Sequence, residues 1–248
     1  MGDTPLASLS LTHVHYNPDD QLSFASAWLA LIPQALCVSY ATLIWSTREV
    51  EVILMFVGQM ACEGLNFILK RVIKEERPKG RCHIGRNIEA QLTRGTEMFG
   101  KGYGMPSSHA QFMTFFSVYL TFFLLFRHSK ASASSYPNVA VLLRFLVMLA
   151  LCLGAAGVAA SRIYLNYHTP KQVLAGCAAG FTCACGWFLI TSVLRRTGWI
   201  EWGLELTVSR LMRVRDLVVS EDLAEAGWQR WETQRLKLRG SKKGKKSA

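Results

Sequence analysis

Long apolar blocks constrain this chain more than any other feature of its sequence. Hydrophobic residues make up 50% of its 248 residues and charged residues only 18%, whereas soluble domains carry about a quarter charged residues. The apolar residues follow one another without the alternation of an amphipathic element. They leave no room for a separate soluble domain. We therefore expect an all-α, polytopic membrane helix bundle.

Five of these blocks are long enough to be membrane spans, because a spanning helix needs about 20 mostly apolar residues. They cover Phe24–Trp45, Val50–Leu69, Ala110–Phe126, Val139–Ala160 and Gln172–Leu194. Gly176 and Gly180 form a small-residue face on the fifth block, and such faces allow helices to approach closely. We expect residues 1–196 to form one membrane-embedded domain, with the functional motifs in the loops 70–109 and 161–172.

Residues 197–248 differ in character from the rest of the chain. The segment Trp199–Met212 is too short and too charged to span, and its two tryptophans suit a helix at the membrane interface. Residues 195–248 hold 13 of the 28 Lys and Arg, and residues 1–47 hold none. The positive-inside tendency therefore predicts a cytosolic, basic C-terminal tail.

The last four residues, Lys245-Lys246-Ser247-Ala248, resemble the dilysine retrieval signal of endoplasmic reticulum membrane proteins. That signal acts on the cytosolic side, so it agrees with the predicted orientation. The alternative is a merely basic, solvated end. We expect a multi-pass protein of the endoplasmic reticulum membrane.

The order of the spans places three polar segments at one membrane face. The second span ends at Lys70, the third begins at His109, and the fourth and fifth are joined by a loop that starts near Ser161. The N-terminus shares that face, and the C-terminus lies at the other. With a cytosolic C-terminus, the three segments face the lumen.

The segment Pro106-Ser107-Ser108-His109 has the pattern of a helix start. A serine before an apolar run is a favoured N-cap. The free N–H groups of a first helical turn, together with the helix dipole, form an anion site. Upstream, the glycines of Gly100-Lys101-Gly102-Tyr103-Gly104 allow the backbone to approach a ligand closely. The glycine spacing is not that of a Walker P-loop.

Three cations are available to bind a phosphoryl group at this face. Lys70 and Arg77 are seven residues apart, so one helix could present both on the same side before Pro78 ends it. Arg162 stands at the end of the fourth span. Arginine binds phosphate through a planar fork and lysine as a point charge. Taken singly, each of these residues is more often a headgroup or positive-inside residue.

Two histidines accompany the cations. A neutral imidazole can attack phosphorus and form a phosphohistidine, and we assign that role to His168. A second imidazole can protonate the departing phosphate as a general acid, and we assign that role to His109. A lone interfacial histidine is usually only an anchor, so the prediction depends on the joint arrangement of the three segments.

At these residues the chain resembles the type 2 phosphatidic acid phosphatase family of membrane lipid phosphatases. The similarity covers residues 11 to about 195 and is greatest to the members that act on dolichyl diphosphate. It includes Leu11-Thr12-His13-Val14, Glu63-Gly64 with Asn66, Tyr103 to His109, and Tyr164-Leu165 with Tyr167-His168-Thr169. The resemblance implies hydrolysis without a metal, through a phosphohistidine. It also implies that phosphate is bound by Lys70, Arg77, Ser107, Ser108 and Arg162.

The chain departs from the family pattern at two positions. Ser108 replaces a glycine, which costs little because a backbone N–H still donates. Gln172 stands where most of the family has an aspartate that supports the nucleophilic histidine. The members that act on dolichyl diphosphate also have a glutamine at this position. A glutamine carbonyl can hold the imidazole tautomer, but it carries no charge.

Glu63, Asn66 and Lys70 form a polar stripe at positions i, i+3 and i+7 of the second span. Ionisable residues inside a membrane are functional by default. We hypothesise that Glu63 supplies the missing carboxylate or holds Lys70 in place. The alternative is that Glu63 only satisfies polar groups of a neighbouring helix.

The predicted activity is hydrolysis of a polyprenyl diphosphate, dolichyl diphosphate in particular, to the lipid monophosphate and inorganic phosphate. This reaction would recycle the lipid carrier of N-glycosylation. The rival interpretations are a phosphatase for another lipid phosphate, such as phosphatidate, and a non-catalytic lipid-phosphate-binding membrane protein. No acidic cluster is suited to hold Mg²⁺. We expect no cofactor, no metal and no nucleic-acid partner. The segment Cys82–Met98 carries no recognisable motif.

Overall fold

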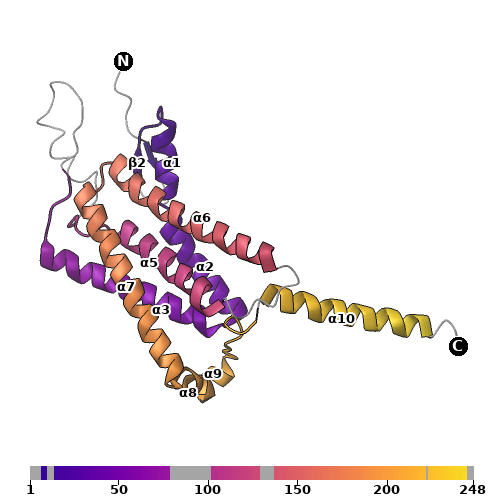
Figure 1. Cartoon of the computed structure of the whole chain (residues 1–248). Coiled ribbons are helices and arrows are strands. Elements are labelled where there is room, and N and C mark those ends of the chain that lie inside the picture. Colours follow the sequence, from indigo (N-terminus) through magenta and orange to yellow (C-terminus); the bar gives the residue numbers. More distant parts are fainter. Residues whose placement is uncertain (1–6, 10–13, 79–101, 129–136, 222, 245–248) are drawn as a thin grey trace, which may run out of the picture.

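The computed structural model describes residues 7–9, 14–78, 102–128, 137–221 and 223–244. In this part of the chain, five helical segments are long and apolar enough to cross a membrane. They are Gln21–Thr47, Val50–Ile73, Ser108–Arg127, Val141–Tyr164 and Pro170–Arg196. The five predicted spans are therefore confirmed, and they form one bundle of packed helices (Figure 1).

The first span is broken into two helices. Helix α1 covers Gln21–Leu29 and helix α2 covers Ile32–Thr47, where the sequence predicted one continuous run. Pro33 lies in the first turn of α2. Proline has no N–H to continue the hydrogen bonding of a preceding turn, so it is tolerated where a helix begins. The break exposes backbone carbonyl groups close to the candidate site.

Helix α3 (Val50–Ile73) ends earlier than the sequence suggested. Its C-cap residue, Lys74, has a left-handed backbone conformation with φ of 53°. The prediction that Lys70 and Arg77 lie on one helix face is therefore wrong. Arg77 follows the helix instead, and because it precedes Pro78 its own helical conformation is disfavoured.

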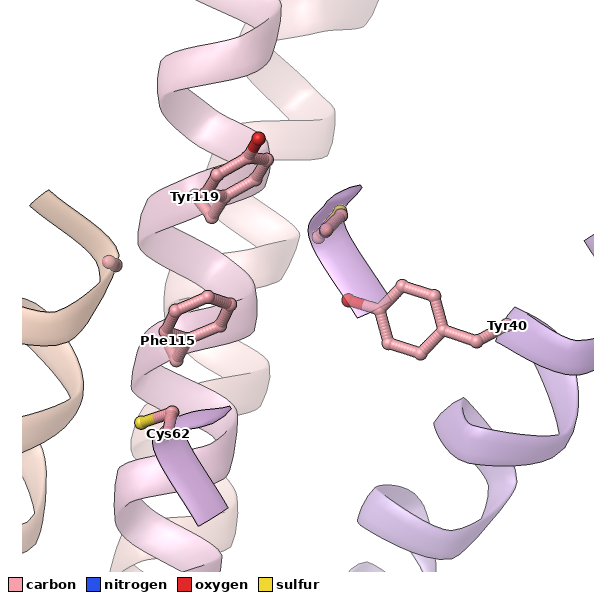
Figure 2. Packing of buried hydrophobic residues seen from close by; sticks show 6 residues of the cluster. Tyr40, Cys62, Phe115 and Tyr119 are labelled. Carbon is pink, nitrogen blue, oxygen red and sulfur yellow. The ribbon is translucent and has the colours of Figure 1, made fainter. Parts of the chain in front are cut away.

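Helix α5 (Ser108–Phe122) is the most buried span. It continues into a π-helical turn, η1 (Phe123–Arg127), and packs against α3, α6 (Pro137–Tyr164) and α7 (Pro170–Arg196). Figure 2 shows Phe115 and Tyr119 one turn apart on α5, beside Cys62 of α3, with Tyr40 of α2 nearby. These residues form the centre of the bundle.

Two glycines of α7 allow α5 to come close. A Cβ atom at Gly176 would lie 2.5 Å from the carbonyl oxygen of Ser107, and one at Gly180 would collide with the carbonyl of Gln111. The predicted small-residue face on the fifth span is confirmed at these two positions. In contrast, α6 exposes Leu142, Leu143 and other apolar side chains, as a lipid-facing helix does.

The described part of the chain is all-α as predicted, apart from one pair of three-residue strands at the N-terminus. Strands β1 (Ala7–Leu9) and β2 (Val14–Tyr16) pair antiparallel. The backbone N–H of His15 donates to the hydroxyl of Tyr167 at 3.0 Å. The N-terminal segment therefore packs at the same end of the bundle as the loop between α6 and α7, as the order of spans predicted.

The C-terminal part contains three helices. The predicted interfacial helix is divided into α8 (Trp199–Glu205) and α9 (Thr207–Leu211), which are followed by α10 (Leu223–Gly244). Helix α10 extends away from the bundle (Figure 1). The possible retrieval signal at 245–248 and the segment Cys82–Met98 lie outside the described residues.

An ionic network that the sequence did not predict joins the spans at the end opposite the candidate site. The buried carboxylate of Glu51 on α3 accepts hydrogen bonds from Arg127 at 2.5 Å, from Arg195 at 2.6 Å and from Tyr119 at 2.9 Å. Arg195 also pairs with Asp216. One carboxylate thus connects the ends of α3, α5 and α7 with the segment after α9.

We predict that Glu51→Ala destabilises the fold by about 3–5 kcal/mol, because Arg127 loses its buried counter-ion and Arg195 keeps only Asp216. Thermal unfolding of the purified protein in detergent would show this as a lower Tm. Glu201→Ala, which removes an exposed carboxylate from α8, is the matched control and should leave Tm unchanged. Equal Tm values for the two variants would contradict a stabilising role for the network.

Candidate active site

The three predicted segments meet at one end of the bundle. Lys70 lies in the last turn of α3, Ser108 and His109 begin α5, Arg162 lies in the last turn of α6, and His168 precedes α7. The ammonium group of Lys70 donates to the hydroxyl of Ser108 at 3.3 Å. Four helix ends therefore supply side chains to one location.

The start of α5 is an uncapped helix end. Ser107 occupies the predicted N-cap position, with φ of −69° and ψ of 115°, but its side chain makes no capping hydrogen bond. The Ser107 hydroxyl is buried and has no hydrogen-bond partner in the described part of the chain. Its backbone N–H donates to the carbonyl of Gln172 at 3.1 Å. The free N–H groups of the first turn suit an anion.

Arg162 is a buried cation that retains hydrogen-bonding capacity. Arg162 is only 3% exposed, and its guanidinium lies 5.3 Å from the centre of the Tyr167 ring. Its Nη2 atom has no hydrogen-bond partner among the described residues. Burying a charge without a counter-ion is costly, so the position favours an anionic ligand.

The loop that carries Arg162 is held by its own backbone. The carbonyl of Arg162 accepts hydrogen bonds from the N–H groups of Tyr167 at 3.1 Å and His168 at 3.2 Å. Asn166, between them, has a left-handed conformation with φ of 57°. This tight turn brings Arg162 and His168 to the same place, although six positions separate them in sequence.

His109 is oriented by the break in the first span. Its Nε2 atom lies 3.2 Å from the backbone carbonyl oxygen of Ala30, between α1 and α2. A carbonyl can only accept, so Nε2 carries a proton. When the ring is protonated, Nδ1 therefore holds the proton that can be given away. The sequence did not predict this contact, since nothing marks Ala30 as functional.

His168 is buried and contacts Gln172. Its Nδ1 atom lies 3.2 Å from Oε1 of Gln172. Burial, followed by the nearby positive charge of Arg77, lowers the pKa of His168 to about 4. The imidazole is therefore neutral near pH 7, which is the form that can act as a nucleophile.

The polar stripe on α3 has two separate roles in the structure. Asn66 donates to Gln111 Oε1 at 2.7 Å, and its Nδ2 lies 3.5 Å from the carbonyl of Pro106. Asn66 thus supports the segment that begins α5. Glu63 instead lies within electrostatic range of Lys70, and its Oε1 has no hydrogen-bond partner among the described residues.

Glu63 also lines a cavity of about 280 Å³ between α2, α3 and α5. Ser108 and His109 also line this cavity, together with apolar residues such as Met60 and Phe112. The structure therefore places Glu63 beside Lys70 and His109. The carboxylate that contacts Gln172 belongs to Glu75, whose Oε1 accepts from Gln172 Nε2 at 3.2 Å.

The glycine-rich segment before α5 is described only from Gly102 onward. A Cβ atom at Gly104 would lie 2.8 Å from both the nitrogen and the oxygen of the Gln172 side-chain amide. The predicted close approach therefore occurs at Gly104, and it is an approach to Gln172. Gln111, which binds the backbone of Cys62 at 2.8 Å, is a further supporting residue, detectable only as an amide inside an apolar block.

The fold and the site together define an integral membrane lipid phosphatase. Residues 50–196 match the model of the PAP2 superfamily. The chain belongs to this superfamily, which is the type 2 phosphatidic acid phosphatase family that its motifs resemble. No solved structure matches the chain.

The chain is similar along most of its length to proteins named as dolichyldiphosphatases. It is 48% identical to the "Putative dolichyldiphosphatase" of Neurospora crassa, over 98% of both chains. It is 34% identical to Dolichyldiphosphatase 1 of Dictyostelium discoideum, over 89% of this chain and 87% of the relative. It is 39% identical to the human Dolichyldiphosphatase 1, over 74% of this chain and 71% of the relative.

We predict that the His168 imidazole titrates near pH 4 in the folded protein, because burial and Arg77 disfavour its charged form. NMR of isotopically labelled histidine in detergent micelles would measure this value, with His168→Gln identifying the resonance by its absence. Because the pKa is lowered on folding, any stability that the neutral ring contributes is complete above about pH 6.5 and is lost as the pH falls towards 4. An ordinary value near 6.5 would contradict the burial of the ring.

We predict that Gly104→Ala slows turnover, because the new methyl group displaces the Gln172 amide from His168. Misplacement of a catalytic group by about 1 Å can cost roughly 10²-fold in rate. Steady-state kinetics would report the effect mainly in kcat. The control is Gly186→Ala on α7, where a Cβ atom meets nothing within 4 Å, and this variant should match the wild type.

Proposed function

We propose that this protein is a metal-independent dolichyl diphosphate phosphatase that acts through a phosphohistidine intermediate and releases dolichyl phosphate and inorganic phosphate. The observation that carries the proposal is the meeting of His109 and His168 with Lys70, Arg77 and Arg162 at one end of an apolar bundle. Relatives that align with most of this chain are named dolichyldiphosphatases, and these names support dolichyl diphosphate as the substrate.

In the first step, Nε2 of neutral His168 attacks the terminal phosphorus of the diphosphate. A P–N bond forms, and the bond from phosphorus to the bridging oxygen breaks. The electron pair of that bond goes to the departing dolichyl phosphate, which takes a proton from Nδ1 of protonated His109. Lys70, Arg77, Arg162 and the N–H groups at the start of α5 stabilise the charge on the equatorial oxygens.

In the second step, water attacks the phosphorus of the phosphohistidine, and neutral His109 accepts its proton. The P–N bond breaks and its electron pair returns to Nε2 of His168. Inorganic phosphate leaves, and both histidines regain their starting states. A single site thereby divides one displacement into two easier ones.

The apolar surroundings suit the proposed substrate. Removing a polyprenyl tail from the bilayer would cost about 0.8 kcal/mol for each CH₂ group exposed to water. An enzyme embedded in the membrane avoids this cost by acting where the diphosphate reaches the polar surface. The cavity beside His109 has an apolar wall and lies on the side of the general acid, which is the side of the tail-bearing leaving group.

The proposed orientation places the site in the lumen of the endoplasmic reticulum and the C-terminus in the cytosol. The basic residues after position 195 support this orientation through the positive-inside tendency. In the structure, the N-terminal strands lie at the site end, whereas the segment after α9 binds the opposite end through Arg215 and Glu49. The reaction would then return the lumenal lipid carrier of N-glycosylation to its monophosphate form.

The donor set supports metal independence. The described residues include no group of three or more His, Cys, Asp or Glu side chains that could hold a metal ion. The charge at the site comes from lysine and arginine side chains, which neutralise phosphate directly and would repel Mg²⁺.

We predict that the purified protein releases phosphate from dolichyl diphosphate in excess chelator. His168→Ala should lose measurable turnover, because the nucleophile is absent. His109→Ala should be slower by about 10²–10⁴-fold, the range typical of general acid catalysis. Acid-labile, base-stable radiolabel on the wild-type protein after rapid quenching would report the phosphohistidine.

The control for this experiment is His128→Ala, which removes an imidazole at the far end of the bundle, where it contacts Val218, and should keep turnover. Phosphatidate, tested in parallel, distinguishes a diphosphatase from a phosphatase for monophosphate lipids. Equal rates for the wild type and His168→Ala would refute the mechanism, and loss of activity in chelator would refute metal independence.

A further inference from the structure

The side-chain amide of Gln172 has a fixed orientation. Its Nε2 atom faces two acceptors, the carbonyl of Glu76 at 2.8 Å and Oε1 of Glu75 at 3.2 Å. Its Oε1 atom faces two nitrogens, the backbone N–H of Thr169 at 3.3 Å and Nδ1 of His168 at 3.2 Å. The reverse orientation would set an oxygen against a carboxylate and an NH₂ group against an N–H.

The fixed amide determines which nitrogen of His168 is nucleophilic. Because Oε1 of Gln172 can only accept, Nδ1 of His168 must carry the proton. The lone pair of the neutral ring is then on Nε2, on the side away from Gln172. The residues behind Gln172 therefore help to set the tautomer needed for attack on phosphorus. Among the described residues, the charged side chain that Gln172 contacts is Glu75.

We infer that Glu75 is the positioning carboxylate of this site, acting on His168 through the Gln172 amide. It shares the orientation of the amide with the Glu76 carbonyl, and its negative charge stabilises the cationic imidazole ring that forms when Nε2 bonds to phosphorus. The inference rests on the proposed phosphohistidine mechanism. It assigns to Glu75 the role that the sequence analysis left open between Gln172 and Glu63.

Glu75 is held in place from two sides. Its Oε2 pairs with Lys171 at 2.9 Å, and its backbone carbonyl accepts from Gly104 at 2.7 Å. The hydrogen bonds from Lys171 and then from Gln172 hold the pKa of Glu75 below its ordinary value. The carboxylate is therefore ionised at neutral pH, and the site that it faces contains the cations Lys70, Arg77 and Arg162.

The geometry also explains why a glutamine fits here. The amide occupies the space that a side chain at Gly104 would fill. It thereby bridges His168 to a carboxylate that lies before the loop, in the segment between α3 and Pro78. The charge reaches the imidazole across one amide, instead of by direct contact with an aspartate.

Exchanging the two side chains provides the decisive experiment. Glu75→Gln removes the negative charge, while the Glu76 carbonyl and the Thr169 N–H still hold the Gln172 amide. The cationic imidazole then loses its stabilising charge, so kcat should fall about ten-fold or more with little change in KM, as loss of an outer supporting partner often does. Gln172→Glu sets a carboxylate against Glu75 and the Glu76 carbonyl and should also be slow. The double variant, Glu75→Gln with Gln172→Glu, places the carboxylate directly on His168 with an amide behind it.

The double variant should therefore be faster than either single variant, a coupling that independent structural effects would not produce. Glu75→Asp, which keeps the charge, should be faster than Glu75→Gln. The matched control is Asp19→Asn, which removes an exposed carboxylate near the N-terminus. This variant should have the wild-type kcat. A wild-type kcat for Glu75→Gln, or a double variant no faster than the slower single variant, would overturn the inference.

A second measurement separates this inference from the proposed function. An NMR titration of His168 in the substrate-free protein should give a lower pKa for the ring in Glu75→Gln than in the wild type, because the charge that favours the protonated ring is removed. This measurement needs no turnover. If the protein does not hydrolyse dolichyl diphosphate, a lowered pKa of His168 still supports the role of Glu75, whereas an unchanged pKa would overturn it.

Discussion

The close contact between α5 and α7 is the constraint on which the site depends. Glycines at 176 and 180 remove the side chains that would hold the two helices apart. The backbone of Ser107 can then bond to the carbonyl of Gln172 at 3.1 Å. This hydrogen bond joins the start of α5, which carries Ser108 and His109, to the start of α7, which follows His168.

The two ends of the bundle differ in whether their buried arginines have carboxylate partners. At the far end, Glu51 and Asp216 pair with Arg127 and Arg195 in a network that connects three helices. At the site end, Arg162 has no carboxylate partner among the described residues and retains an unused donor. A protein can keep such an unfavourable arrangement when its ligand supplies the missing charge.

The sequence correctly predicted the features that depend on the length and polarity of the apolar blocks and on their order along the chain. The five spans, the common location of Lys70, His109 and His168, and the small-residue face of α7 all follow from those properties. It predicted poorly whatever depends on backbone conformation. Arg77 was placed on the helix because nothing before Pro78 marks Lys74 as a left-handed C-cap. Glu75 was missed for the same reason, since its contact with Gln172 requires the chain to leave the helix and fold back. The Glu51 network joins residues up to 165 positions apart, and pattern alone does not pair them.

The broken first span makes the catalytic unit larger than the stretch that the superfamily model matches. That match begins at residue 50, yet the carbonyl that orients His109 belongs to Ala30, and the N–H that binds Tyr167 belongs to His15. The amino-terminal segment thus helps to shape the candidate site. A minimal version cut to residues 50–196 would keep Lys70, His109, Arg162 and His168 and still lack the carbonyl that orients His109.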